Sequence, residues 1–301
     1  MSNDSPSPPR SEWLGQVPVT RALLALNVGM FVVEVAITHL FTDIPSDKAL
    51  ELGASYALAT VGENRWETLV TACFLHGGVV HLALNMVFLW LAGPVVERAV
   101  GSARMAPMYL AAGAFGNVLS VAYYWYARSG TFGVGASGAI SGVLAAALVV
   151  GWRLQGWKGP LTQAMVRWLG FMIVLSVASK LAGGSIDNAT HLGGALAGAV
   201  IAGMWRRGHR YSDRATRAIL AACVGVLVAC IVIVGVHDRT DPFARMTLLD
   251  RFRFTNEALA DGRCRDAHDG LRAVERLRER LAPVTSLRNQ VEAMCGHVDG
   301  E

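Results

Sequence analysis

The stretch GASGAISGVLAAALVVG, residues 135–151, places two serines at the head of a segment apolar enough to lie in lipid. Small residues four apart, here Ser137 with Ser141 and Gly138 with Gly142, let two membrane helices approach closely, and serine is common in such interfaces. The same stretch also has the small residues that an exposed nucleophilic serine needs around it. The rest of the chain decides between helix packing and chemistry.

The whole chain has the composition of a multi-pass membrane protein. Of its 301 residues, 53% are apolar and only 17% are charged, whereas a soluble globule usually has about 25% charged residues. A spanning helix needs about 20 mostly apolar residues. Such windows lie at 22–41, 79–96, 106–127, 135–151, 165–182, 190–205 and 218–236. We therefore expect an all-α polytopic fold with seven spans, of which the short fourth and sixth end below a membrane surface or lie inside the bundle.

The two ends of the chain are expected on opposite sides of the membrane. Residues 1–14 are polar and proline-rich, and no cleavage site follows an apolar core, so we expect a disordered tail and no signal peptide. The N-terminal segment and the even-numbered connections together hold twelve Lys and Arg residues, whereas the odd-numbered connections hold four. This bias predicts a cytoplasmic N-terminus and, after seven crossings, an extracytoplasmic C-terminus. The net charge of +4 is thus a topology signal, and we expect no nucleic-acid partner.

Unusual polar residues gather at the starts of the second, fourth and sixth expected spans. These spans all run inward from the outer face, so their starts lie at one level. His81 and Asn85 share one face of the second span, Ser137 begins the fourth, and His191 begins the sixth. An interhelical hydrogen bond is the commoner explanation for any single one of them. Several such polar residues at one depth in the membrane indicate a functional site.

Together these residues supply the parts of an acyl-transfer reaction. A serine hydroxyl is a weak nucleophile until a base takes its proton, and an imidazole with a pKa of about 6.5 suits that task. We therefore expect Ser137 as the nucleophile and His191 as the general base. Candidate donors to the oxyanion are the backbone N–H of Ser137 and the side chains of His81 and Asn85. No H-E-x-x-H pair is present, so we expect neither a metal nor a cofactor.

Five motifs follow one another in a characteristic order. They are PVT (18–20) with Asn27, LVTACFLHGGVVHLALNM (69–86), VERAVGS (96–102), GASGAISG (135–142) and THLGGALAG (190–198). In this order they resemble the rhomboid family of intramembrane serine proteases, over about residues 15–207. The resemblance implies a six-helix catalytic core with a dyad of Ser137 and His191 and no required acid. It also implies oxyanion support from His81 and Asn85.

The same resemblance implies partners and one packing role. The substrates would be single-pass transmembrane proteins in the lipid bilayer, cut at small residues in locally unwound segments near the outer face. Gly194 and Gly198 match the small pair that packs the sixth span against the fourth. By family analogy, the expected location is an inner or plasma membrane.

Two departures from the family pattern concern the site and the first outer loop. Ser141 stands where the family usually has Tyr or Phe against the catalytic imidazole, so Asn188 or Ser141 itself is the candidate support for His191. The RWE sequence at 65–67 reverses the usual Trp-Arg order, which puts the stability of this loop in doubt. Neither change removes a catalytic group. Asp187 is interpreted as a helix cap and not as a third catalytic residue.

The chain beyond the six-span core divides into two expected parts. Residues 208–236 contain a basic inner loop and the seventh helix, and residues 237–301 form an extracytoplasmic helical tail. Two amphipathic helices are expected in this tail, near 255–281 and 284–297. They contain Cys264 and Cys295, and both a disulfide and two free thiols remain open. A further extracytoplasmic protein is a candidate partner of the tail, although one hairpin is shorter than stable repeat arrays.

Three classes of function compete at this point. An intramembrane serine endopeptidase is favoured because nucleophile, base and oxyanion donors occur at one depth. The alternative is a catalytically inactive rhomboid-like protein that binds membrane clients, but such relatives usually lack the serine or the histidine. A transporter or channel is disfavoured, because the polar groups lie near one face and no inverted repeat is evident.

Overall fold

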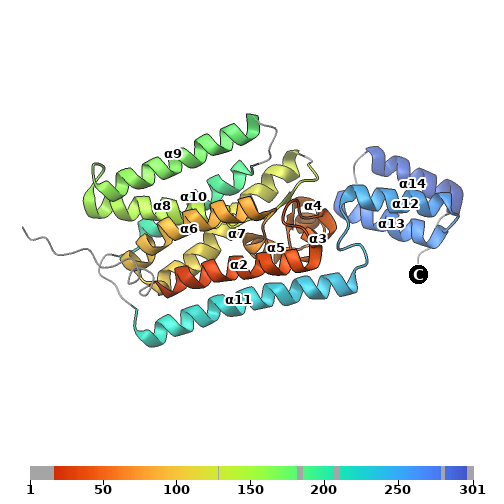
Figure 1. Ribbon diagram of the computed structural model, residues 1–301. Helices are drawn as coiled ribbons and strands as arrows, with labels where there is room; N and C mark the ends of the chain where they lie inside the picture. The colour runs from red at the N-terminus through yellow and green to blue at the C-terminus, as the bar shows by residue number, and fades with distance from the viewer. Residues whose placement is uncertain (1–16, 128, 182–185, 207–210, 279–281, 297–301) are drawn as a thin grey trace, which may run out of the picture.

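Seven long helices run alongside one another in the computed structural model, which describes residues 17–127, 129–181, 186–206, 211–278 and 282–296 (Figure 1). They are α2 (Pro18–Thr38), α6 (Val79–Val100), α7 (Ser102–Ala127), α8 (Ser137–Gln155), α9 (Pro160–Leu181), α10 (Asn188–Met204) and α11 (Asp213–Thr240). Each overlaps one of the seven expected apolar windows, so the all-α polytopic fold is confirmed. The tail expected to be disordered, residues 1–14, lies outside the described residues.

Of the two short helices, α8 lies at the centre of the bundle, whereas α10 buries one face and leaves Leu192, Leu196 and Val200 exposed on the other. Helix α8 has 19 residues and α10 has 17. The other five helices, together with α8, are long and apolar enough to cross a membrane by length and composition. Helix α10 packs against α8 on one side and α7 on the other. In α8, 67% of the apolar window is buried, compared with 6% in α11, which lies on the outside of the bundle (Figure 1).

The start of α2 is held by a carboxylate from α6. Glu97 is 2% exposed, and its two oxygens accept from Val19 N at 2.9 Å and from Thr20 N at 2.8 Å. They also accept from the hydroxyls of Thr20 and Ser102, each at 2.7 Å. The first backbone N–H groups of a helix have no partner within the helix, and the helix dipole favours a negative charge there. Glu97 therefore joins the start of α2 to the turn between α6 and α7.

The connection between α2 and α6 folds into short elements at one end of the bundle. These are α3 (Ser46–Glu51), β1 (Ser55–Tyr56), α4 (Ala57–Gly62), α5 (Thr68–Thr71) and η1 (Ala72–Phe74). Strand β1 pairs antiparallel with β2 (Phe132–Gly133), with Ser55 opposite Gly133 and Tyr56 opposite Phe132. The segment that leads into α8 is thus tied to this connection, which we call the first loop (residues 39–78).

The C-terminal tail forms three helices, where the sequence predicted two. They are α12 (Leu248–Ala260), α13 (Cys264–Arg278) and α14 (Ala282–Cys295). The single helix expected over 255–281 is wrong, because Gly262 has a φ of +67° and ends α12 in a turn. The buried apolar residues of this C-terminal unit are Ala258, Leu259, Ala267, Leu271, Val274, Val284, Leu287 and Val291.

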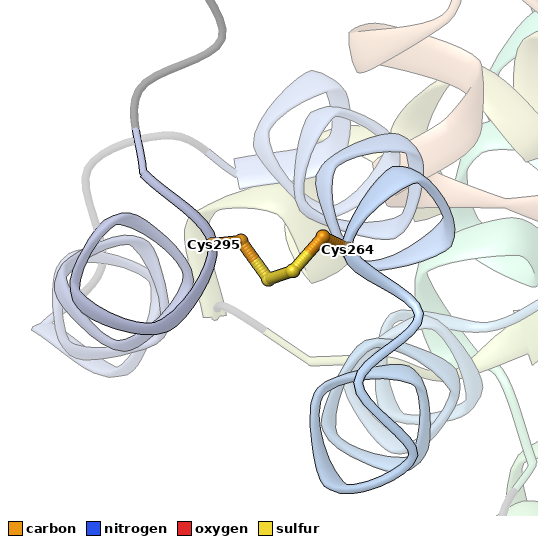
Figure 2. The surroundings of a disulfide bond; sticks show 2 residues. All are labelled: Cys264 and Cys295. Atoms are coloured by element: carbon orange, nitrogen blue, oxygen red, sulfur yellow. A yellow bond between two sulfur atoms is a disulfide. The ribbon is translucent and has the colours of Figure 1, made fainter.

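A disulfide joins two helices of the C-terminal unit, α13 and α14. Figure 2 shows the bond between Cys264, at the start of α13, and Cys295, at the end of α14. Their Cα atoms are 5.3 Å apart, with 31 residues of sequence separation. The structure thus favours the disulfide over two free thiols. Closing a loop of this length typically contributes about 2–4 kcal/mol, which matters for a unit with so small a core.

The C-terminal unit lies at the end of the bundle where α6, α8 and α10 begin (Figure 1). Helix α13 packs directly on α4. A Cβ at Gly62 would overlap the carbonyl oxygen of Arg276, so the two backbones touch. The tail therefore packs against the first loop and is not connected to the bundle through α11 alone.

We predict that Glu97→Gln lowers the stability of the membrane bundle. The amide keeps one oxygen but turns an N–H₂ group toward backbone donors, which should cost about 1–3 kcal/mol. Thermal unfolding in detergent micelles measures this loss. Glu257→Gln, an exposed carboxylate on α12, is the control with the same charge change and should have almost no effect. Equal stability of the two variants would contradict the role given to Glu97.

Candidate active site

The turn that leads into α8 brings Ser137 close to His81. Gly135 has a φ of +132°, which favours glycine, and its N–H donates to the carbonyl of Ala72 at 2.9 Å. A Cβ at Gly135 would lie 2.8 Å from Cε1 and 2.9 Å from Nε2 of His81, and 3.7 Å from Oγ of Ser137. The imidazole of His81 and the hydroxyl of Ser137 therefore border the same small space beside Gly135.

The starts of α8 and α10 touch one residue away from Ser137 and His191. A Cβ at Gly138 would lie 2.6 Å from Cγ2 of Thr190 and 3.4 Å from its carbonyl oxygen. Further along, a Cβ at Gly194 would overlap the carbonyl oxygen of Gly138. Because backbone packs on backbone here, the nucleophile and base candidates are held at one end of the same helix pair.

The same packing continues one turn further into the bundle. A Cβ at Gly198 would overlap the carbonyl oxygen of Gly142, just as one at Gly194 would overlap that of Gly138. Interhelical packing through Gly194 and Gly198, expected from the sequence, is therefore confirmed. The small residues of GASGAISG serve helix packing at Gly138 and Gly142, whereas Ser137 is half-buried at the open end of the contact.

Helix α6 brings the two oxyanion candidates to this end of the bundle. Asn85 is 4% exposed, and its side-chain Nδ2 is buried with no hydrogen-bond partner among the described residues. His81 and His191 are both half-buried. A buried donor without an acceptor costs free energy, so the amide of Asn85 is a group that a developing negative charge could use.

Glu34 on α2 supports the turn before α6. Both of its carboxylate oxygens lie 3.1 Å from the backbone N of His76, which donates to them. The ring of His76 meets that of His81 edge-on, with centroids 5.4 Å apart. Burial lowers the pKa of His76 to about 3, so this ring is neutral. His76 is thus a packing partner of His81.

Asp187 acts as the N-cap of α10, as the sequence predicted. Its carboxylate accepts from Thr190 N at 3.0 Å and from Thr190 Oγ1 at 2.8 Å. The hydroxyl of Ser120 on α7 donates to the same carboxylate. An N-cap fixes where a helix begins, so Asp187 sets the position of His191 one turn into α10.

The support expected for His191 is not formed by either candidate. Asn188 accepts a hydrogen bond from Ser176 on α9. In the described part of the chain, no hydrogen bond joins His191 to Ser141, to Asn188 or to Ser137. Catalytic hydrogen bonds often tighten only when substrate is bound. The packing of α10 and its cap at Asp187 therefore fix the helix start that carries His191.

The reversed order at 65–67 produces a different anchor for the first loop. Arg65 is 3% exposed, donates to the carbonyl of Ala244 at 2.8 Å and lies 3.4 Å from the Glu67 carboxylate. Glu67 also lies 3.0 Å from Nδ1 of His237 near the end of α11. The intervening Trp66 is exposed. Arg65 and Glu67 thus fasten the loop to the segment that follows the membrane bundle.

The bundle and the residues gathered at its end define a multi-pass helical membrane protein with a serine and two histidines at neighbouring helix starts. Residues 63–208 match the family described as the rhomboid domain. This match and the relatives described below support membership of the chain in the rhomboid family. Among the described residues, no group of three or more His, Cys, Asp or Glu side chains is placed to hold a metal ion.

Three relatives illustrate this relationship. The rhomboid protease GluP of Bacillus subtilis (strain 168) is 37% identical over 142 residues, which cover 46% of this chain and 26% of that protein. The rhomboid protease AarA of Providencia stuartii is 28% identical over 205 residues, covering 62% of this chain and 72% of AarA. RHOMBOID-like protein 6, mitochondrial, of Arabidopsis thaliana is 35% identical over 159 residues, 51% of this chain and 48% of that protein. Two of these relatives are described as rhomboid proteases, and the matched segments span between 26% and 72% of the length of the three proteins.

We predict that Gly194→Ala separates α8 from α10. The added methyl group would overlap the Gly138 carbonyl oxygen, and overpacking of this kind typically costs about 1–3 kcal/mol. Thermal unfolding should show the loss. Gly203→Ala is the matched control, because it lies on the same helix with nothing within 4 Å of the added atom. A destabilised Gly203→Ala and an unchanged Gly194→Ala would refute the assigned packing.

Proposed function

We propose that this chain is an intramembrane serine endopeptidase that cleaves transmembrane helices of membrane-protein substrates near the outer membrane face. Ser137 attacks the scissile carbonyl, and His191 takes the proton of the serine as general base. The observation that carries the proposal is the contact of Gly138 with Thr190, because these residues adjoin Ser137 and His191. The rhomboid proteases among the relatives support the same reaction.

The oxyanion of the tetrahedral intermediate would be stabilised from α6 and α8. We assign this role to the Nδ2 of Asn85, the ring of His81 and the backbone N–H of Ser137. The buried amide of Asn85 without a partner and the closeness of His81 to Gly135 and Ser137 support the assignment. Preorganised donors are effective because they need no reorientation when charge develops.

The substrate would be a single-pass transmembrane protein with small residues near its outer boundary. We place the site close to the outer face, with the N-terminus in the cytoplasm, the C-terminal unit outside, and the chain in an inner or plasma membrane. The distribution of Lys and Arg supports this orientation. The disulfide at the end of the bundle where α6, α8 and α10 begin also fits an oxidising outer compartment.

We predict that Ser137→Ala and His191→Ala each abolish cleavage. Loss of a nucleophile or its base typically lowers kcat by about 1000-fold or more. Purified protein in detergent is incubated with a single-pass substrate, and the products are identified on gels and by mass spectrometry. Ser141→Ala, one turn further along α8, should keep most of the activity, because no hydrogen bond of Ser141 to His191 is present among the described residues.

Each outcome of this assay has a definite meaning. Cleavage by the parent and not by the two variants supports the dyad. Equal cleavage by the parent and both variants refutes the dyad, because the cleavage then comes from a contaminating protease and not from this chain. A folded parent that cleaves none of a set of transmembrane substrates favours the alternative, a catalytically inactive protein that binds membrane clients.

We also predict that Asn85→Ala lowers the rate of cleavage without lowering the stability of the protein. Losing one oxyanion donor typically lowers kcat by about 100- to 1000-fold. Stability should be kept, because the amide that is removed has no partner. Asn117→Ala is the contrasting variant: its amide donates to the carbonyl of Leu69 at 2.8 Å, so it should lower the melting temperature. A large stability loss in Asn85→Ala with unchanged kcat would contradict the oxyanion role.

A further inference from the structure

The C-terminal unit is fastened to the first loop by a buried arginine. Arg251 on α12 is wholly buried, and its two terminal nitrogens donate to the two carboxylate oxygens of Glu63 at 2.6 and 3.0 Å. The remaining donors of the guanidinium reach the backbone carbonyls of Phe243, Met246 and Ala273 at 2.8 to 3.3 Å. A bidentate arginine pair fixes both distance and orientation. It therefore holds α4 in one position relative to α12.

An apolar contact adjoins this ion pair. Leu277 of α13 is 1% exposed and packs with Leu50, Tyr56 and Leu58 of the first loop. Arg276, next to it, lies 3.1 Å from Glu63 and 2.8 Å from Asp241. The unit thus contributes part of the core of the first loop.

Tyr56 links the C-terminal unit to the strand pair that precedes the proposed nucleophile. Its hydroxyl accepts from the backbone N of Leu248, the first residue of α12, at 3.1 Å. Tyr56 is 2% exposed and pairs with Phe132 across the two short strands. Strand β2 ends at Gly133, two residues before Gly135. A continuous chain of contacts therefore runs from α12 to the turn beside Ser137.

Strand β2 also lies close to the cap of α10. A Cβ at Gly133 would lie 3.9 Å from Oδ2 of Asp187, the residue that caps the helix of His191. The strand pair is only two residues long on each side, and a two-stranded ribbon has little stability of its own. Its position therefore depends on what packs against Tyr56.

We propose that Tyr56, Glu63 and Arg251 are positioning residues, through which the C-terminal unit fixes β2 and the turn before Ser137 and so sets the turnover of the cleavage reaction. The inference rests on the proposed function for its effect on turnover. None of the three residues touches the reacting groups; they act through Phe132, Gly133 and Gly135. The C-terminal unit then acts on the reaction only through its contacts with the first loop.

The test uses the full chain in detergent micelles with a single-pass transmembrane substrate. Tyr56→Phe removes the acceptor for Leu248 and keeps the ring, and Arg251→Gln removes the bidentate pair. Both should lower kcat by about 10- to 100-fold, the effect of a small misplacement near the reacting groups. KM should stay within about twofold, because the substrate-contacting surface is unchanged. All rates are measured well below the melting temperature of each variant.

The matched controls have the same chemistry at positions without these contacts. Tyr126→Phe changes a tyrosine that is 87% exposed at the end of α7. Arg253→Gln lies on α12 two residues from Arg251, and its side chain is 64% exposed. Both controls should cleave like the parent. Arg251→Lys should recover only part of the lost rate, since lysine cannot form the bidentate pair.

A second measurement does not require activity. Hydrogen exchange of residues 130–136 should speed up by about tenfold or more in Tyr56→Phe and Arg251→Gln, because local opening of the strand pair becomes easier. Unchanged exchange there overturns the inference, as does unchanged kcat in variants whose exchange has increased. If the parent and Ser137→Ala are equally inactive, the proposed function fails, and the exchange at 130–136 alone decides whether the unit holds this turn.

Discussion

The contact between α8 and α10 is the constraint on which the rest of this structure depends. Carbonyl oxygens of Gly138 and Gly142 lie where side chains at Gly194 and Gly198 would have to go. In a membrane, where lipid is as apolar as the helix surface, such close backbone packing is a main source of helix association. It brings the start of α10 against the start of α8. The helix starts that carry Ser137 and His191 adjoin at one end of the bundle for this reason.

Polar side chains inside the bundle perform distinct structural tasks around this contact. Glu97 satisfies the first N–H groups of α2, Glu34 accepts from the turn before α6, and Asp187 caps α10. Each carboxylate is used at a chain end or turn where backbone donors lack partners. The amide of Asn85 differs from them, because its Nδ2 is buried without a partner among the described residues. This difference separates a candidate for transition-state binding from groups that stabilise the fold.

Much of this arrangement could be predicted from the sequence, because its signals are local. Apolar windows of about 20 residues placed all seven long helices, and Gly194 with Gly198 marked the packing face of α10. The Gly262 turn was missed, although a D-G pair inside a polar helical pattern is a turn signal. Glu63 and Arg251 are 188 residues apart in the sequence. Glu97 and Val19, its partner in α2, are 78 residues apart. No local pattern contains such contacts, so only the folded chain could reveal them.

Labelling with a fluorophosphonate tests the central claim most directly, because the probe reacts with a serine only when base and oxyanion donors are in place around it. The parent protein in detergent is treated with the probe, digested, and the modified residue is located by mass spectrometry. The account predicts modification at Ser137 and not at Ser141, and loss of this modification in His191→Ala. Modification of Ser141, or equal labelling of Ser137 with and without His191, would contradict the assigned site.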